Sequence, residues 1–207
     1  MNTEEMINNY WKYYLILEEN FEKATRYVEL TPDNYKTYSI EFVGQIQSIC
    51  SEIDVVMKEL CEYDKEPNDK EPNDRKPNDR KNMNDYINPI LSNYSEIKNM
   101  VVQSGNILHK PFDNWDESKP AQSLPWWDAY NSIKHGRVIN MKEANLENVL
   151  KSLMALYLLE MLLYKKIADK MNVIDIFPHK SKLFAIKDWE SKYMSLLGNI
   201  AIQVNNM

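Results

Sequence analysis

The sequence predicts an all-α protein, an antiparallel bundle of roughly four or five helices with a small accessory β hairpin. The chain has only four glycines in 207 residues and is rich in Leu, Ile, Met, Lys and Glu, which suits helices better than a sheet with many tight turns. Apolar residues also recur every three or four positions over long stretches, as on one face of a helix. We expect a single domain over residues 1–207.

The helical spacing runs through four segments, residues 4–28, 35–60, 88–101 and 142–171. Thr31-Pro32-Asp33 ends the first, because the residue before a proline disfavours helix. Asn88-Pro89 is expected to open the third. The fourth is Leu-rich on more than one side, which predicts a place in the core or at a subunit interface. A last, weaker helix is expected over 188–200.

Two stretches depart from the helical pattern. A tandem pentapeptide at 64–82 places a proline in each full unit among alternating charges, so we expect a solvated linker between helices, with a ligand-binding charged repeat as the alternative. Residues 101–108 carry two short apolar runs around Ser104-Gly105-Asn106, which predicts a β hairpin. Residues 183–186 can add a strand to it, and 113–122 is expected to be irregular loop.

Composition excludes several classes of function. A net charge of −6 is unfavourable for nonspecific binding to duplex nucleic acid, although Lys134 and Arg137 can still form a local basic site. The chain has no apolar run long enough to cross a bilayer, and its acidic N-terminal residues do not resemble a signal peptide, so we expect a cytoplasmic protein without membrane contact.

Histidines and cysteines give no metal or cofactor signature. His109, His135 and His179 are widely separated, and no two cysteines have the spacing of metal ligands, so we expect neither a metal nor a cofactor. Cys50 and Cys61 fall on one predicted helix, roughly 16 Å apart at about 1.5 Å rise per residue. They cannot bridge each other, and we expect buried free thiols in a reducing compartment.

The most distinctive stretch is LPWWDAYNSIKHGR, residues 124–137. It predicts a helix in which Ser123 caps the start and Pro125 occupies the first turn. Gly136 is expected to end this helix in a left-handed conformation.

Helical periodicity divides this stretch into two faces. Trp126, Tyr130 and Ile133 fall on one stripe, and Asp128, Asn131 and His135 fall on the opposite one. One face can therefore pack while the other is available for chemistry or for a partner.

The polar residues suit the cleavage of RNA without a metal, in which a 2′-hydroxyl attacks the neighbouring phosphate. The imidazole of His135 can transfer protons near neutral pH, and Lys134 and Arg137 can bind phosphate. Asn131, one turn earlier, can fix the tautomer of His135 or donate to a phosphate oxygen. The alternative is that His135 and Arg137 only cap the end of their helix, where cations are favoured.

The aromatic residues also have two interpretations. Trp126, Trp127 and Tyr130 can stack on bases, or they can belong to the core or to a dimer interface. We include Trp127, Tyr130 and Asp128 as candidate substrate contacts.

The order of segments resembles one known family. YSIEFVGQIQSICSEIDVVMKELC (38–61), then a further helix, then WWDAYNSIKHGR at a helix end and a long Leu-rich helix resemble the HEPN-like family of small bacterial all-α domains. The resemblance covers residues 4–170 apart from the linker and the hairpin, and rests on the order of segments and on a YNxxKHxR pattern. Members include ribonucleases of toxin–antitoxin, abortive-infection and anti-phage systems.

The resemblance implies that His135 matches the family's motif histidine. The arginine that active members carry upstream would fall at Asp128, Ala129 or Tyr130, and none of these is arginine. The resemblance further implies a homodimer in which the two motif helices face each other. We therefore expect a metal-independent endoribonuclease of a defence or toxin system that uses His135, Lys134, Arg137 and Asn131. The alternative is a noncatalytic dimeric scaffold that engages an antitoxin, a nucleotidyltransferase or another defence protein.

Overall fold

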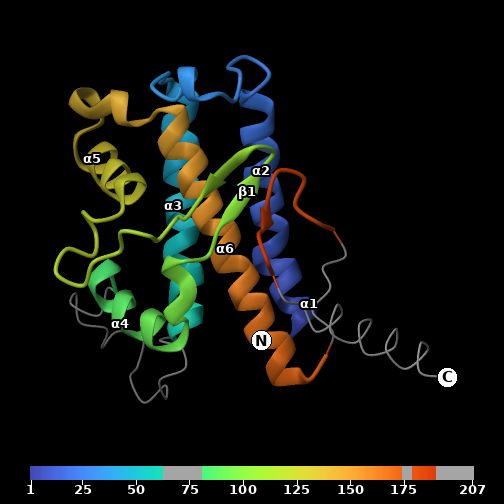
Figure 1. Cartoon of the computed structure of the whole chain (residues 1–207). Helices are drawn as coiled ribbons and strands as arrows, with labels where there is room; N and C mark the ends of the chain where they lie inside the picture. The colour runs from blue at the N-terminus through green and yellow to red at the C-terminus, as the bar shows by residue number, and fades with distance from the viewer. Residues whose placement is uncertain (63–80, 174–178, 190–207) are drawn as a thin grey trace, which may run out of the picture.

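A computed structural model describes residues 1–62, 81–173 and 179–189. It consists mainly of helices, with a small antiparallel sheet of three strands against one side of the bundle (Figure 1). The all-α class and the accessory sheet are thereby confirmed. The expected linker at 64–82 and the expected helix at 188–200 lie largely outside the described residues.

The N-terminal helix has three consecutive parts, α1 (Thr3–Met6), the π-helical turn η1 (Ile7–Trp11) and α2 (Lys12–Ala24). Its start is fixed by a capping box in which Asn2 and Glu5 each accept the other's backbone N–H. A 3₁₀ turn, η2 (Pro32–Asn34), follows where the proline signal predicted a break. The π-helical turn has no counterpart in the sequence prediction.

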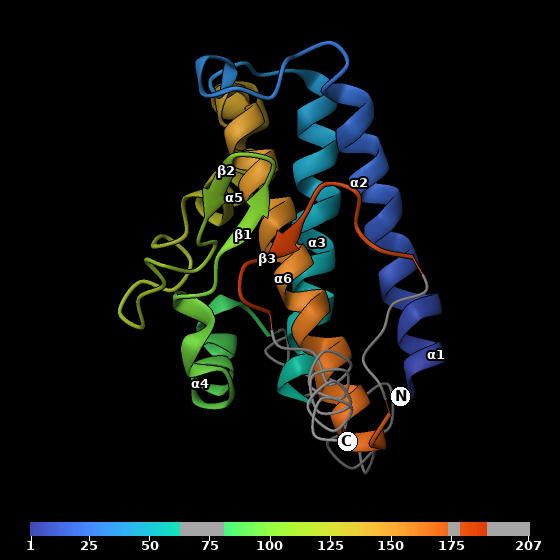
Figure 2. The same cartoon turned by 45° about the vertical axis from the view of Figure 1, so that its right-hand side comes forward.

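Two long helices form the centre of the molecule, α3 (Ile40–Cys61) and α6 (Leu146–Met171). Ser39 and Asn145 cap them by accepting the backbone N–H three residues further on. The two helices run side by side in the same direction (Figures 1 and 2). A bridge between Tyr38 and Asn145 joins their starts, and the Lys166 ammonium donates to the Leu60 carbonyl near their ends.

The helix before the hairpin starts earlier than expected. α4 spans Met83–Asn93 and contains Pro89, and the 3₁₀ turn η6 (Ser95–Lys98) follows it. The prediction that Asn88-Pro89 opens this helix is wrong. A capping box between Asn82 and Asp85 sets the start instead, because together they satisfy two of the backbone N–H groups there.

The sheet contains β1 (Val102–Ser104), β2 (Ile107–His109) and β3 (Ala185–Ile186), in the order β2-β1-β3. Val102 lies opposite His109 on one side and Ile186 on the other, and both pairings are antiparallel. Gly105 turns the hairpin with φ 55°, a left-handed value that favours glycine. Both the hairpin and the added strand agree with the prediction (Figure 2).

A buried carboxylate fastens the β3 segment to the N-terminal helix. Glu18 accepts hydrogen bonds from the Tyr14 hydroxyl (2.8 Å) and from the backbone N–H groups of Lys182 (3.0 Å) and Leu183 (3.2 Å). The Ser181 hydroxyl also donates to Glu18. These bonds satisfy a charged group that would otherwise be expensive to bury.

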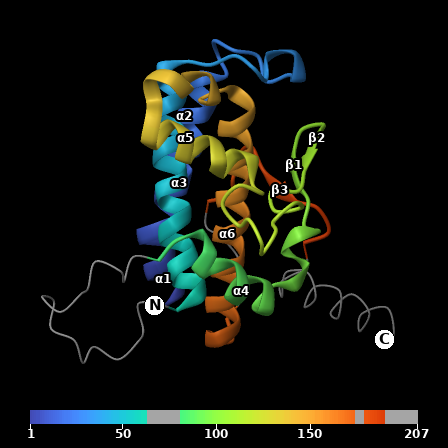
Figure 3. The same ribbon diagram turned by 90° about the vertical axis from the view of Figure 1, so that its left-hand side faces the viewer.

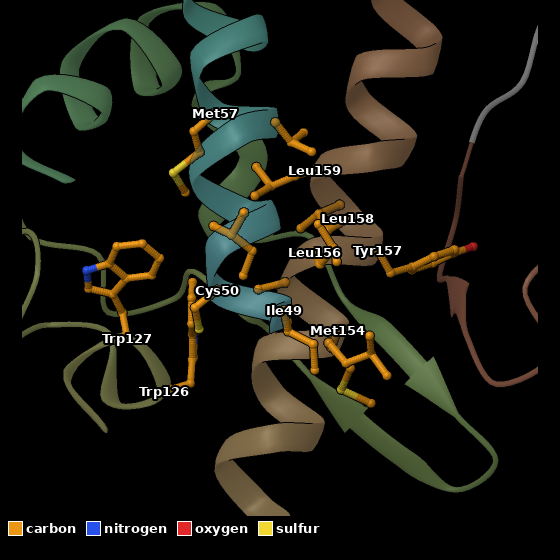
Figure 4. Close-up of a cluster of buried hydrophobic side chains, with 14 of the residues drawn as sticks. Ile49, Cys50, Met57, Trp126, Trp127, Met154, Leu156, Tyr157, Leu158 and Leu159 are labelled. Carbon is orange, nitrogen blue, oxygen red and sulfur yellow. The ribbon is translucent and has the colours of Figure 1, made fainter. Parts of the chain in front are cut away.

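The buried apolar side chains form one cluster to which the helices and the sheet all contribute. Figure 4 shows part of it, where side chains of α6 meet those of α3. No described helix has both the length and the apolar composition needed to cross a membrane.

Candidate functional site

The distinctive stretch forms α5, which spans Pro125–Asn140. Pro125 occupies the first turn as predicted, where its missing N–H leaves no bond unmade. The expected cap is wrong, because Leu124 holds the cap position and makes no side-chain bond there. The Ser123 hydroxyl accepts the backbone N–H of Asp116 instead, at 2.9 Å. Ser123 therefore fixes the preceding loop rather than the helix start.

The expected left-handed ending at Gly136 is also wrong. Gly136 has φ −156° and ψ 52°, and the chain returns to helical geometry up to Asn140. The Asn140 side-chain amide donates to the Ser132 carbonyl at 2.9 Å, so a side chain satisfies a carbonyl that a glycine cap would otherwise help to cover. α5 is thus two helical parts joined at a kink.

The aromatic face of α5 packs inward, as its periodicity predicted. Trp126 is 1% exposed and donates its indole N–H to the Pro111 carbonyl at 3.0 Å. The Trp127 ring lies edge-on to it at 5.9 Å between centroids, and Tyr130 lies 5.1 Å from Trp127. Figure 4 shows both indoles beside α3.

Burial of these rings bears on their proposed roles. Trp127 is 6% exposed and Tyr130 is 9% exposed, so neither ring has a free face on which a base can stack in this conformation. Both rings lie where the alternative interpretation places them, in the core. Tyr130 still borders the surface, because the Lys134 ammonium lies 5.4 Å from the centre of its ring.

The polar residues of the stretch lie on the outside. Asp128, Lys134, His135 and Arg137 are exposed, and Asn131 is half-buried. In the described part of the chain, neither His135 nor Arg137 is held by a hydrogen bond or an ion pair, and Asn131 does not fix the tautomer of His135. The His135 imidazole and the Arg137 guanidinium are consequently available to an external group, whereas the Lys134 ammonium lies over the Tyr130 ring.

The second half of α5 carries two exposed aliphatic side chains that the sequence prediction did not include. Val138 is 91% exposed and Ile139 is 88% exposed, directly after the cationic residues. Figures 1 and 3 show this half of α5 and the start of α3 at the same end of the bundle. The start of α3 exposes Ile40 as well, at 65%. Two β-branched residues shortly after His135 are visible in the sequence, but Gly136 was expected to end the helix before them.

Metal ligands and cysteine thiols are the other groups that could carry chemistry. Within the described residues, no group of three or more His, Cys, Asp or Glu side chains is arranged to hold a metal ion. Cys50 and Cys61 are free thiols on α3, and burial raises the pKa of Cys61 to about 11. A thiol of this kind is unsuited to act as a nucleophile near neutral pH.

Comparison with models of known protein families, with curated proteins and with solved structures gives no match for this chain. Its function is therefore inferred from the residues of α5.

Proposed function

We propose that this protein is a HEPN-like, metal-independent endoribonuclease of a defence or toxin system, with an active site completed between two copies of the chain. One observation carries this proposal. The exposed His135 imidazole lies between two exposed cations, Lys134 and Arg137, on a helix whose other face is anchored in the core. A helix that presents a proton-transfer group beside phosphate-binding cations suits the cleavage of RNA.

The chemistry needs both a base and an acid. One imidazole removes the proton of a 2′-hydroxyl, whose oxygen then attacks the adjacent phosphorus. The bond from phosphorus to the 5′-oxygen breaks, and that oxygen takes a proton from a second, protonated group. The products carry a 2′,3′-cyclic phosphate and a 5′-hydroxyl. Lys134 and Arg137 stabilise the charge that develops on the phosphate oxygens.

A second copy of the chain would supply the missing group. Each chain contributes one His135, and a two-fold axis near α5 would bring two such residues to one groove. The exposed Val138 and Ile139 provide the apolar contact that such an interface needs. RNA bound in the groove would meet an imidazole and a pair of cations from each copy.

A noncatalytic function is the second candidate, and the residues upstream of His135 favour it. Where active HEPN-like members carry arginine, this chain has Asp128, Ala129 and Tyr130. Ala129 and Tyr130 are buried, and Asp128 would repel a phosphate. In this case the same exposed end of α5 would hold a dimer that binds a protein partner, such as an antitoxin or a nucleotidyltransferase.

The two candidates are separated by incubating the purified protein with end-labelled single-stranded RNA in the presence of EDTA. We expect cleavage with 2′,3′-cyclic phosphate ends, and a loss of about 100-fold or more in rate for His135→Ala. His179→Ala is the matched control, because His179 is also exposed but lies far from α5 in the sequence. Cleavage that survives His135→Ala would refute the site, and intact RNA under all salt conditions would favour the scaffold.

A further inference from the structure

A glutamate lies in the core in the middle of α6. Glu160 is 0% exposed, and neither of its carboxylate oxygens has a hydrogen-bond partner. Among the described residues, no Lys, Arg or His pairs with it. An ionised carboxylate without a partner is very unfavourable inside a protein, so such a group keeps its proton.

A second glutamate lies opposite. The contact between Leu60 and Lys166 joins positions 106 apart in sequence, and α3 and α6 run in the same direction. Glu52 of α3 is therefore level with about position 158 of α6, within one turn of Glu160. Glu52 is half-buried, and burial raises its pKa to about 7. Burial first, and then the charge of Glu52, raise the pKa of Glu160 well above its usual value.

The N-terminal helix closes this junction from a third side. The Trp11 ring lies 6.2 Å from the ring of Tyr157, which precedes Glu160 by one turn on the same face of α6. Trp11 ends the π-helical turn η1, where the regular spacing of helical hydrogen bonds is interrupted. The titratable groups on this side include the phenols of Tyr14, on the N-terminal helix, and Tyr157, on α6, whose rings lie 5.7 Å apart. Glu18 accepts a hydrogen bond from the Tyr14 hydroxyl there, and within the described part of the chain the only charge that acts on Glu160 itself is that of Glu52. Burial raises the pKa of both phenols, so they are neutral near pH 7 and do not offset a negative charge on Glu160.

We propose that Glu160 and Glu52 form a proton-binding site where the N-terminal helix, α3 and α6 meet, and that loss of its proton loosens this junction. With the proton bound, Glu160 is a neutral acid and the three helices pack around it. Once the proton leaves, two carboxylates oppose each other across an apolar contact. Movement of α6 away from the N-terminal helix, next to the π-helical turn, relieves the repulsion by admitting water.

The direction of the pH effect follows from the raised pKa values. In the unfolded chain a glutamate titrates near pH 4.3, whereas both of these groups hold their protons to higher pH in the folded chain. The folded state therefore binds more protons than the unfolded state above about pH 4.3. Stability falls as pH rises from there through the folded pKa values, that of Glu52 being about 7.

The test is urea unfolding between pH 5 and pH 9 of the full chain and three variants, Glu160→Gln, Glu52→Gln and Glu59→Gln. We expect the ratio of folded to unfolded wild type to fall relative to Glu160→Gln by up to about tenfold per pH unit. Glu52→Gln removes the charge that opposes ionisation of Glu160. The stability of this variant should therefore stop falling at a lower pH than that of the wild type. Glu59→Gln removes an acid from the same face of α3 as a control and should follow the wild type.

Infrared spectroscopy gives a second readout, and its first measurement uses the wild type alone. At pH 7 we expect the carbonyl band of protonated carboxylic acid, shifted by ¹³C-labelling of glutamate. In Glu160→Gln this band should shrink to the part that Glu52, with a pKa of about 7, contributes. If the glutamine variant does not fold, Glu160→Leu serves as the uncharged comparison. Parallel pH curves for wild type and the uncharged variant, or the absence of an acid band, would overturn the proposal.

Discussion

The side-chain amide of Asn140 donates a 2.9 Å hydrogen bond to the backbone carbonyl of Ser132, eight residues earlier. This bond spans the kink at Gly136 and joins the two halves of α5. A Cβ atom at Gly136 would lie 3.0 Å from the amide nitrogen of Asn140. The orientation of His135 and Arg137 thus depends on a small residue at the kink.

The first prediction concerns this contact. Asn140→Ala should lower the free energy of unfolding by about 1 kcal/mol, the usual contribution of a hydrogen bond of this kind. Gly136→Ala should be more harmful in the wild type than in the Asn140→Ala background, because the atom that its Cβ displaces is then absent. Urea unfolding of the two single variants and the double variant measures this coupling. Equal effects of Gly136→Ala in both backgrounds would contradict it.

The second prediction concerns the exposed aliphatic pair. Replacing Val138 and Ile139 together by glutamate should weaken self-association at least about 100-fold, since two aliphatic side chains contribute roughly 3 kcal/mol or more when buried. Sedimentation velocity over a range of protein concentrations measures the change. Leu108→Glu is the control, because Leu108 is also an exposed aliphatic residue, at 56%, but lies on β2 and not on α5. The dimer proposal fails if the double variant and the control sediment alike.

The third prediction separates the core aromatic residues from the surface cations. Trp127→Ala should lower the free energy of unfolding by about 3–5 kcal/mol, because its ring is buried against its neighbours. Lys134→Ala should change stability by less than about 1 kcal/mol, because its ammonium is exposed. Lys134→Ala should instead weaken RNA binding, measured by filter retention at several salt concentrations. A stable Trp127→Ala protein with weakened RNA binding would restore the stacking role of this ring.

The sequence predicted those parts of the site that depend on local periodicity. Helical periodicity placed Trp126, Tyr130 and Ile133 of α5 inside, and the structure agrees. It placed Asp128, Asn131 and His135 on the opposite face, where Asp128 and His135 are exposed and Asn131 is half-buried. The hairpin followed from two short apolar runs around a glycine turn. Such features could be predicted because they depend on neighbours within a few residues.

The parts that the prediction missed depend on contacts between residues further apart. Gly136 was expected to end the helix, but α5 continues to Asn140, whose side-chain amide donates to the Ser132 carbonyl. Ser123 was expected to cap α5, but its hydroxyl accepts the backbone N–H of Asp116 in the preceding loop. In the first case the Asn140 amide binds a backbone carbonyl, and in the second the Ser123 hydroxyl binds a backbone N–H outside the helix. A local pattern does not reveal such a competing partner.

The sequence by itself determined a helical protein with a hairpin and a helix that presents His135 between two cations, because helical periodicity and turn chemistry are local. Tertiary structure alone decided that Trp127 is buried and that Val138 and Ile139 are exposed. It also decided that Glu160 lies opposite Glu52 without a hydrogen-bond partner. The physical reason is that burial is a property of packed neighbours. An acid inside a Leu-rich helix is solvated or enclosed according to which helices pack around it.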